Sequence, residues 1–275
     1  MSTQTLAANP ALAAGDVATK HRVPAIVRHS LLLAQRSLMK TFRTPEALID
    51  VTIQPAIFLV LFTYVFGGAI SHGSQHDYLQ YLLPGILGQT IALGGIAIGV
   101  NLSEDVDKGI FDRFRALPIG RSVPLIGAVA ADVFRYASVF IVTMVMGYIL
   151  GFRASGSVLD ILAAGVLAAA FALCLSWASV WVGMKARTPG AVQGIMMLIL
   201  FPLSFASSTF ASPTTMPSWL RTFSENNPLT HLVDAERSLL TGAPMGDHLW
   251  QTGLWMVGLV AVFFPLALRA YRKKV

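Results

Sequence analysis

The chain has 275 residues, of which 55% are hydrophobic and only 12% are charged, with a mean hydropathy of +0.64. A soluble domain carries no such surplus of apolar side chains, so the composition predicts an integral membrane protein. The net charge of +6 would suit a nucleic-acid-binding protein, but the positions of the charges favour membrane topology instead. The single cysteine, Cys174, lies in an apolar run, which excludes an intrachain disulfide and paired-cysteine chemistry.

Two segments precede the first apolar run. Residues 1–23 are polar and lack the apolar core of a secretory signal, so we expect a flexible cytosolic tail. Residues 24–43 place apolar and basic side chains on different helical faces, which predicts an amphipathic helix lying along the membrane surface. The cations of this interfacial helix are Arg28, Arg36, Lys40 and Arg43. The alternative, a soluble helix packed on another domain, is disfavoured because the chain offers no other domain.

Six apolar runs follow, and each has the roughly 20 residues that a helix needs to cross about 30 Å of hydrocarbon. The runs cover residues 47–70, 79–100, 123–150, 158–183, 190–210 and 249–268. No internal repeat relates them, which argues against folds built from inverted halves. The sequence therefore predicts an all-α membrane protein with six spans.

The Lys and Arg residues divide unequally between the two sides of these spans. Sixteen of the 20 fall before the first run, in the loops after the second and fourth runs, and after the sixth. Only Arg153, Arg221 and Arg237 fall on the other side, and Arg135 lies within a span. Because cytosolic segments carry the excess of basic residues, both termini are predicted to be cytosolic.

The loop between the second and third runs is the most charged part of the chain. Ser103–Pro124 reads SEDVDKGIFDRFRALPIGRSVP, and helical spacing aligns Val106, Ile110, Phe114 and Leu117 into one apolar stripe. We expect a cytosolic helix that begins with Ser103 as its N-cap and stops at Pro118. An amphipathic helix held between two spans is suited to docking another protein. The alternative is a solvated charged loop.

Between the fifth and sixth runs, residues 211–248 contain signals for two short helices. One begins near Pro217; the other has Asn227 as N-cap and Pro228 at its first position, and it ends at Gly242. Helices that are too short to span but are apolar on one side predict re-entrant or surface-lying elements on the outer side. An ordinary extracellular loop is the alternative.

Polar residues inside the apolar runs are few. Asp132 and Arg135 are three residues apart on the third run and are expected to pair across one helical turn, in a structural role. The other candidates are uncharged side chains that could line a substrate path. They are Gln54 in the first run, Gln89 and Thr90 in the second, and Ser204 and Ser207 in the fifth.

The sequence contains no signature of an enzyme or of a resident cofactor. It has no GxxxxGK[ST] phosphate loop, so ATP is not bound in that way, and no paired-cysteine metal site. His72 and His76 are four residues apart in a short outer loop, and we interpret them as solvated side chains rather than a metal site.

Several motifs, taken in order, resemble the membrane subunits of ABC-2 type exporters, and within them the daunorubicin-resistance permease branch. The strongest is KGIFDRFRALPIGR in residues 108–121, joined by Leu83-Pro84-Gly85, Pro189-Gly190-Ala191-Val192-Gln193-Gly194, Phe201-Pro202-Leu203-Ser204-Phe205, Met216-Pro217-Ser218-Trp219-Leu220 and Asn226-Asn227-Pro228-Leu229-Thr230. The pieces cover the chain from about residue 30 to its end. Gly120 departs from the pattern, where a hydroxyl residue is expected.

This resemblance implies that residues 44–275 form a six-span permease that pairs with a second permease copy and with two copies of a separate ATPase, which holds the ATP and Mg. It places the protein in the plasma membrane of a bacterium, with a substrate path at the dimer interface beside the first, second and fifth spans. It makes the charged loop a coupling helix that contacts the ATPase. The expected coupling residues are Glu104, Lys108, Gly109, Asp112, Arg113, Arg115, Pro118 and Arg121.

The function expected on these grounds is ATP-driven export of a hydrophobic or amphipathic, drug-like compound. Export of a polysaccharide or a lipid-linked glycan by the same machinery is an alternative. A proton-coupled secondary transporter is another, although it would be expected to have an unpaired carboxylate in mid-membrane, which the spans lack. A membrane scaffold without transport activity is the third.

Overall fold

The computed structural model of the chain describes residues 45–70, 75–109 and 123–274, and within them every element is a helix. The helices are α2 (Pro45–Ile70), α3 (Gln75–Gly94), α4 (Ile96–Asp107), α6 (Val123–Leu150), α7 (Val158–Lys185), α8 (Pro189–Phe205), the 3₁₀ helix η2 (Pro213–Thr215), α9 (Ser218–Glu225), α10 (Pro228–Thr241) and α11 (His248–Lys274). The expected tail (1–23) and interfacial helix (24–43) lie outside the described residues.

Four segments of the described residues are long and apolar enough to cross a membrane. They are Gln75–Asp107, Asp132–Leu150, Val158–Lys185 and His248–Arg272. Ile53–Gly67 and Pro189–Phe205 are shorter apolar helices at the positions of the first and fifth expected runs. The structure thus agrees with an all-helical membrane protein, and its long helices fall where the apolar runs are.

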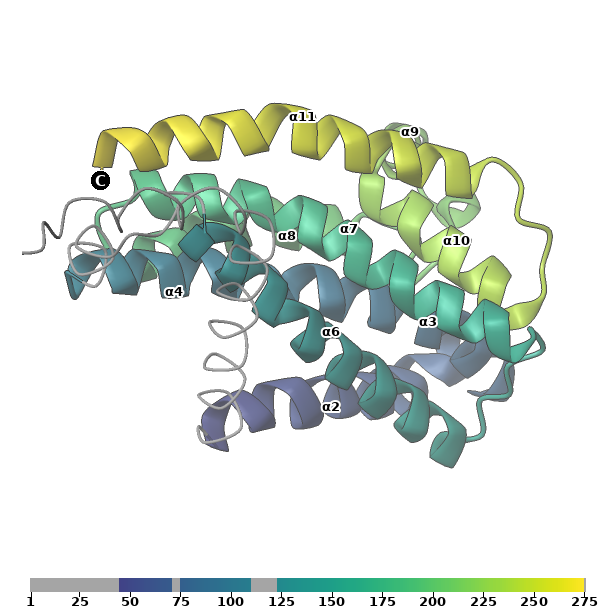
Figure 1. Cartoon of the computed structure of the whole chain (residues 1–275). Coiled ribbons are helices and arrows are strands. Elements are labelled where there is room, and N and C mark those ends of the chain that lie inside the picture. The colour runs from purple at the N-terminus through teal and green to yellow at the C-terminus, as the bar shows by residue number, and fades with distance from the viewer. Residues whose placement is uncertain (1–44, 71–74, 110–122, 275) are drawn as a thin grey trace, which may run out of the picture.

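The long helices run side by side as a bundle with two distinct ends (Figure 1). At one end, here called the basic end, α4, α7 and α11 finish near Lys108, Lys185 and Arg272. The opposite end carries the connection from α6 to α7 and that from α10 to α11. Helix α7 is central, because it packs against α3, α4, α6, α8, α10 and α11.

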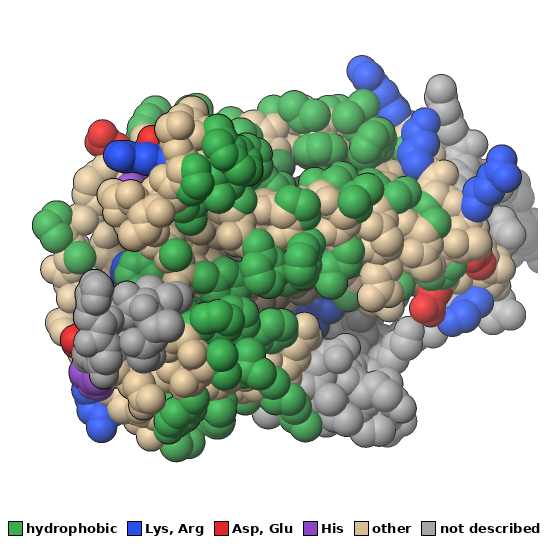
Figure 2. All heavy atoms as spheres, turned by 180° about the vertical axis from the view of Figure 1, so that it is seen from behind, with side chains coloured by type: hydrophobic (Ala, Val, Ile, Leu, Met, Phe, Trp, Pro, Cys, Tyr) green, Lys and Arg blue, Asp and Glu red, His purple; other side chains and the backbone are tan. Residues whose placement is uncertain are grey.

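Large apolar side chains cover the sides of the bundle between its two ends. Val166, Leu198 and Val257 expose 68%, 75% and 68% of their surface. Figure 2 shows hydrophobic side chains over the middle of one face, with most of the charged side chains toward the two ends. A surface of this kind is unfavourable in water and is suited to contact with lipid tails or with other apolar helices.

Helices α4 and α7 cross at very short range through small residues. A Cβ atom added to Gly99 would lie 2.3 Å from the Ser179 carbonyl oxygen, and one added to Gly183 would lie 2.5 Å from the Gly99 carbonyl oxygen. Only glycine allows two backbones to approach so closely, as is common between membrane helices. This crossing fixes α4 against the central helix.

The expectation that a new helix begins at Ser103 is wrong. Helix α4 continues through Ser103 to Asp107, and the Ser103 side chain is fully buried. The physical reason is that Ile98, Leu102 and Val106 extend one apolar face across this position and pack together. Extending an existing helix avoids the cost of nucleating a new one.

Helix α10 is inserted into the bundle, where it packs against α3, α7 and α11. Its ends are those expected from the sequence: the Asn227 side chain accepts a hydrogen bond from the Leu229 amide, and Gly242 adopts the left-handed conformation (φ 69°) that closes the helix. Near its end, the Leu240 carbonyl accepts from the Ser155 amide at 3.0 Å. The segment between α8 and α11 is therefore not an ordinary surface loop.

Candidate functional site

The described coupling residues lie at the last turn of α4. Lys108 pairs with Glu104 at 3.0 Å, with 62% and 36% of the two side chains exposed. Gly109 turns the chain away from the helix in a left-handed conformation (φ 66°), so its role is that of a helix terminator. The remaining coupling residues lie outside the described residues: Asp112, Arg113, Arg115, Pro118 and Arg121. An exposed ion pair of this kind adds little stability and is free to exchange partners.

The side chains expected along a substrate path occupy different environments. Gln54 is exposed on α2, whereas Gln89 on α3 is buried and its Oε1 has no hydrogen-bond partner; Thr90 is half-buried. Ser204 and Ser207 are fully buried, and the Ser207 hydroxyl donates to the Ser204 carbonyl at 2.6 Å. The structure brings the two serines together, and no hydrogen bond among the described residues joins them to either glutamine.

A row of stacked phenylalanine rings joins α2 to α8, which the sequence analysis did not identify. On α2, Phe58, Phe62 and Phe66 follow one another at helical spacing, with ring centroids 5.9 and 5.1 Å apart. Phe210 stacks on Phe62 at 4.5 Å and continues to Phe205 at 4.9 Å. The i, i+4 spacing on α2 was a visible signal, but the link through Phe210 depends on the turn after α8. Here this set is called the phenylalanine row.

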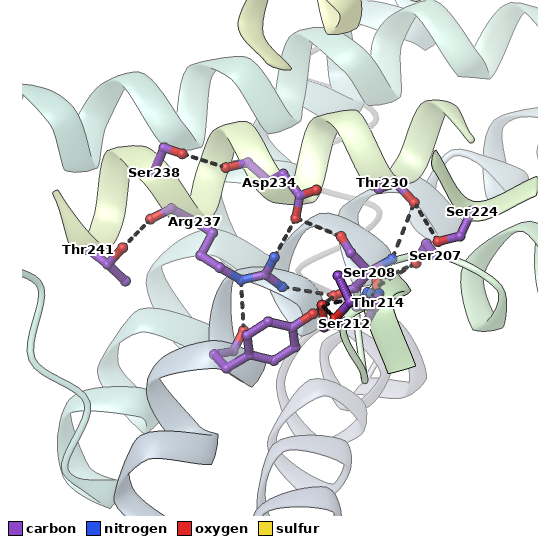
Figure 3. Close-up of polar contacts among 12 residues, drawn as sticks. Ser207, Ser208, Ser212, Thr214, Ser224, Thr230, Asp234, Arg237, Ser238 and Thr241 are labelled. Carbon is purple, nitrogen blue, oxygen red and sulfur yellow. Dashed lines mark hydrogen bonds and ion pairs between the residues drawn. The ribbon is translucent and has the colours of Figure 1, made fainter. Parts of the chain in front are cut away.

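The turn after α8 is held in place by a polar cluster at Arg237 of α10 (Figure 3). The Arg237 guanidinium pairs with Asp234 and donates to the main-chain carbonyls of Ser208, at 2.8 Å, and Tyr81, at 3.3 Å. It also stacks on the Tyr81 ring, 3.8 Å from the centroid. The Ser208 hydroxyl donates to Asp234 at 2.7 Å. The cluster ties α3, α8 and α10 together, and its sequence signal is the i, i+3 spacing of Asp234 and Arg237.

The Asp132 and Arg135 side chains on α6 form an ion pair at 2.8 Å, at the spacing that the sequence indicated. The pair is mostly buried, since Arg135 exposes 17% and Asp132 exposes 15% of the side chain. Arg135 also donates to the main-chain carbonyl of Gly94, at the end of α3. This third contact lies between residues 41 positions apart, so no local pattern predicts it.

Glu236 of α10 is a further candidate that the sequence analysis overlooked. Its side chain is fully buried, and neither carboxylate oxygen has a hydrogen-bond partner. It faces Gly88 of α3 so closely that a Cβ atom there would lie 2.9 Å from Oε2. Because α10 was read from sequence as an outer helix with one apolar side, nothing indicated that this acid would face the interior.

Within the described residues no group of three side chains is arranged to hold a metal ion. Of the two histidines considered above, His72 lies outside the described residues, and His76 lies within hydrogen-bonding distance of Gln80, at 3.4 Å.

The described residues thus offer three candidate sites: the end of α4, the surface formed by α2 and α8, and the polar side chains that contact α3.

Comparison with known proteins places these features in one family. The family model of the ABC-2 type transporter matches residues 29–241. The chain is 39% identical to the daunorubicin resistance ABC transporter permease protein DrrB1 of Streptomyces coeruleorubidus, over 87% of this chain and 84% of that protein. It is 26% identical to the doxorubicin resistance ABC transporter permease protein DrrB of Mycobacterium tuberculosis, over 84% of each. A putative transport permease, ycf38 of Cyanophora paradoxa, is 26% identical over 78% of this chain and 74% of that protein. The chain belongs to the ABC-2 type transporter family.

Proposed function

We propose that this chain is the membrane-spanning permease subunit of an ATP-driven exporter that moves a hydrophobic or amphipathic, drug-like compound out of a bacterial cell. The observation that carries the proposal is the likeness to a daunorubicin resistance permease along 87% of this chain. It includes the α2–α8 region and the segment after α4, the parts expected to contact substrate and ATPase. The apolar sides of the bundle support a place within the bilayer.

We infer six spans, formed by the four long apolar segments together with α2 and α8. Helix α8 has 17 residues and reaches roughly 25 Å, less than the hydrocarbon thickness of about 30 Å. Residues 206–210 and the inserted α10 fill the remaining depth. Irregular backbone at that depth is tolerated only when it is buried in protein, and the Arg237 cluster supplies such partners. The excess of Lys and Arg at the basic end supports a cytosolic position for that end and for both termini.

The partners we propose are two copies of a separate ABC ATPase, which would bind ATP and Mg, and a second permease copy. The sequence has no phosphate loop of its own, and Glu104 and Lys108 lie exposed at the basic end. We propose the charged residues from Glu104 to Arg121 as the contact with the ATPase.

A drug-like cargo is supported by the surface between α2 and α8. The phenylalanine row offers aromatic faces, and Phe201 and Phe205 expose 52% and 41% of their surface. Aromatic rings bind planar and apolar compounds through stacking and burial of carbon surface. We propose that Gln54 lies beside this surface as a polar contact of the path, and that Gln89, Thr90, Ser204 and Ser207 support it from within the bundle.

The test is transport by purified permease and ABC ATPase reconstituted in liposomes, with daunorubicin as the probe. We expect movement of the probe that requires ATP and is lost when the ATPase is omitted. A second arm supplies a proton gradient without ATP. That arm is informative because Glu236 is the one fully buried carboxylate among the described residues. Transport driven by the gradient alone would contradict the proposal in favour of ion coupling.

A further inference from the structure

The helix of the second apolar run, which spans Gln75–Asp107, is interrupted by one irregular turn at Gly95, here called the break, although Gly95 keeps right-handed helical backbone angles (φ −61°, ψ −16°). Helix α3 ends at Gly94 and α4 begins at Ile96. The Gly95 amide donates to the Ala92 carbonyl at 3.1 Å, a contact three residues back that interrupts the regular α-helical pattern. Carbonyls at such an interruption lack their usual partners, and in a membrane only protein groups can replace them.

Arg135 of α6 supplies the replacement. Its Nη2 donates both to the Gly94 carbonyl and to Asp132. The carbonyl end of a helix carries a partial negative charge, so a guanidinium at this position is favourable. A Cβ atom added to Gly94 would lie 3.4 Å from the Tyr136 ring and 3.7 Å from Arg135, so the two α6 side chains fit closely around the break.

The same cluster contains a buried hydrogen-bond donor that has no partner. The Arg135 Nε is buried and has no hydrogen-bond partner, whereas the Tyr136 hydroxyl interacts with the Asp132 and Arg135 side chains. The Tyr136 oxygen would lie 3.6 Å from a Cβ atom at Gly95, so this group faces the break. Buried donors without partners are costly and are uncommon in a static arrangement. The Arg135 Nε would gain a partner if α4 tilted relative to α3 and presented another carbonyl to it.

The position of the break in the chain connects it with the coupling segment. Helix α4 leads into residues 108–122, and α6 leads out of them. Beyond this segment α4 packs mainly on α7 and α8, whereas α6 packs on α2, α3 and α7. Displacing the segment would therefore act on two helices that share α7 but differ in their other neighbours, and the contact of Arg135 with Gly94 links α6 directly to the second span.

We propose that Arg135 is a positioning residue for energy coupling, because its contact with Gly94 sets the angle between the two halves of the second span and passes movement of the coupling segment to the transport path. This inference rests on the proposed function. In this proposal the Asp132–Arg135 pair does more than neutralise its own charges. The turn between α3 and α4 can adopt two arrangements, and the Arg135 guanidinium favours one of the two.

The experiment compares Arg135→Gln and Arg135→Lys with wild type in the reconstituted permease–ATPase complex. We expect Arg135→Gln to retain basal ATP hydrolysis within about twofold, as a substitution that leaves assembly intact does. Stimulation of hydrolysis by daunorubicin and transport should both fall by about tenfold or more, the usual size of a coupling energy between sites. Lys keeps one charged donor, so Arg135→Lys should restore part of both. Arg221→Gln, which breaks an exposed ion pair on α9, is the matched control and should behave as wild type.

A second measurement follows the movement of α4 relative to α6. Spin labels at Asn101 on α4 and Ala137 on α6, both exposed positions, report the distance between these two helices. In wild type we expect a distance change between the nucleotide-free and ATP-trapped states of the ATPase, and in Arg135→Gln we expect none.

The outcomes separate the two proposals. Wild-type stimulation and an unaltered distance change in Arg135→Gln would overturn the positioning role while leaving the exporter intact. An equal loss of basal and stimulated hydrolysis would also overturn it, by showing a purely structural role. If wild type itself shows no ATP-dependent transport, the proposed function fails and this inference fails with it.

Discussion

Two aspartate–arginine pairs hold the second apolar run, and they do so in different ways. On α10, Arg237 pairs with Asp234 and binds the Tyr81 carbonyl of α3; this pair is called the outer clamp. On α6, Arg135 pairs with Asp132 and binds the Gly94 carbonyl of α3; this pair is called the inner clamp. In both, the acid precedes the arginine by three residues and the guanidinium binds a main-chain carbonyl of α3. Arg237 uses Nε, Nη1 and Nη2, and it stacks on Tyr81. Arg135 uses Nη2 alone for both contacts and its Nε has no partner; it also lies over the Tyr136 ring, but at 5.5 Å from the centroid rather than 3.8 Å.

The difference indicates which part of α3 is fixed and which part is adjustable. A guanidinium with every nitrogen occupied and a ring beneath it is committed to one geometry. A guanidinium with a spare donor beside a helix break has an alternative geometry available. In the proposed orientation the first clamp lies on the outer side of the bundle and the second lies nearer the ATPase. We expect the outer clamp to serve stability and the inner clamp to serve coupling.

Removing the outer clamp should have the largest effect on stability. Arg237→Gln leaves Asp234 without its charge partner and two carbonyls without a donor, in a site where the pair exposes only 16% and 19% of its side chains. We expect a loss of about 3 kcal/mol in the free energy of unfolding. Denaturant unfolding in detergent, followed by helical circular dichroism, measures it. A loss no larger than that of Arg135→Gln would contradict the comparison.

The crossing of α4 with α7 offers a second test, because it determines how freely α4 moves beside the inner clamp. Gly99→Ala would place a Cβ atom 2.3 Å from the Ser179 carbonyl and force the helices apart, which we expect to cost about 2 kcal/mol. Gly258→Ala on α11 is the matched control, since nothing lies within 4 Å of a Cβ atom there. Equal stability of the two variants would show that the crossing has room to adjust.

For the inner clamp we expect a smaller change in stability than in coupling. Arg135→Gln removes one ion pair and one contact with a carbonyl, so the same unfolding measurement should show a loss of about 1–2 kcal/mol. Its loss of stimulated hydrolysis should exceed that of Arg237→Gln when both are compared at a temperature where both are folded. A stability loss as large as that of Arg237→Gln would make the two clamps equivalent.

The sequence predicted the features that depend on neighbouring residues and missed those that depend on contacts between distant parts of the chain. The ends of α10 were foreseen because Asn227, Pro228 and Gly242 act on their own backbone. The starts of α6, α7 and α11 followed from apolar length to within one residue, whereas α11 continues six residues past its expected end at Leu268. The break beside Gly94 was not foreseen, because the second apolar run was read as one continuous span.

The missed features depend on contacts between distant parts of the chain. Ser103 was misread as a helix start because α4 is buried against α7 and α8, which no local pattern shows. Ser204 and Ser207 are fully buried, and the adjacent Ser208 is bonded to Thr230 and Asp234 of α10, contacts that span more than 20 residues. The arginine contacts with Gly94, Tyr81 and Ser208 are long-range as well. Assigning a role to any of these residues required the packing of the helices, not their spacing.

A third acid faces α3 between the two clamps, and it sharpens the comparison because it has no arginine. Glu236 lies against Gly88, fully buried and without a hydrogen-bond partner in the described structure. A charged carboxylate in such a site would be costly, so the neutral acid is the form that its surroundings accommodate. Glu236→Gln keeps the shape and stays neutral, and we expect it to change the free energy of unfolding by less than about 1 kcal/mol at neutral pH. A loss as large as that of Arg237→Gln would show that Glu236 is held as a charged group, which would make it a third clamp on the same helix.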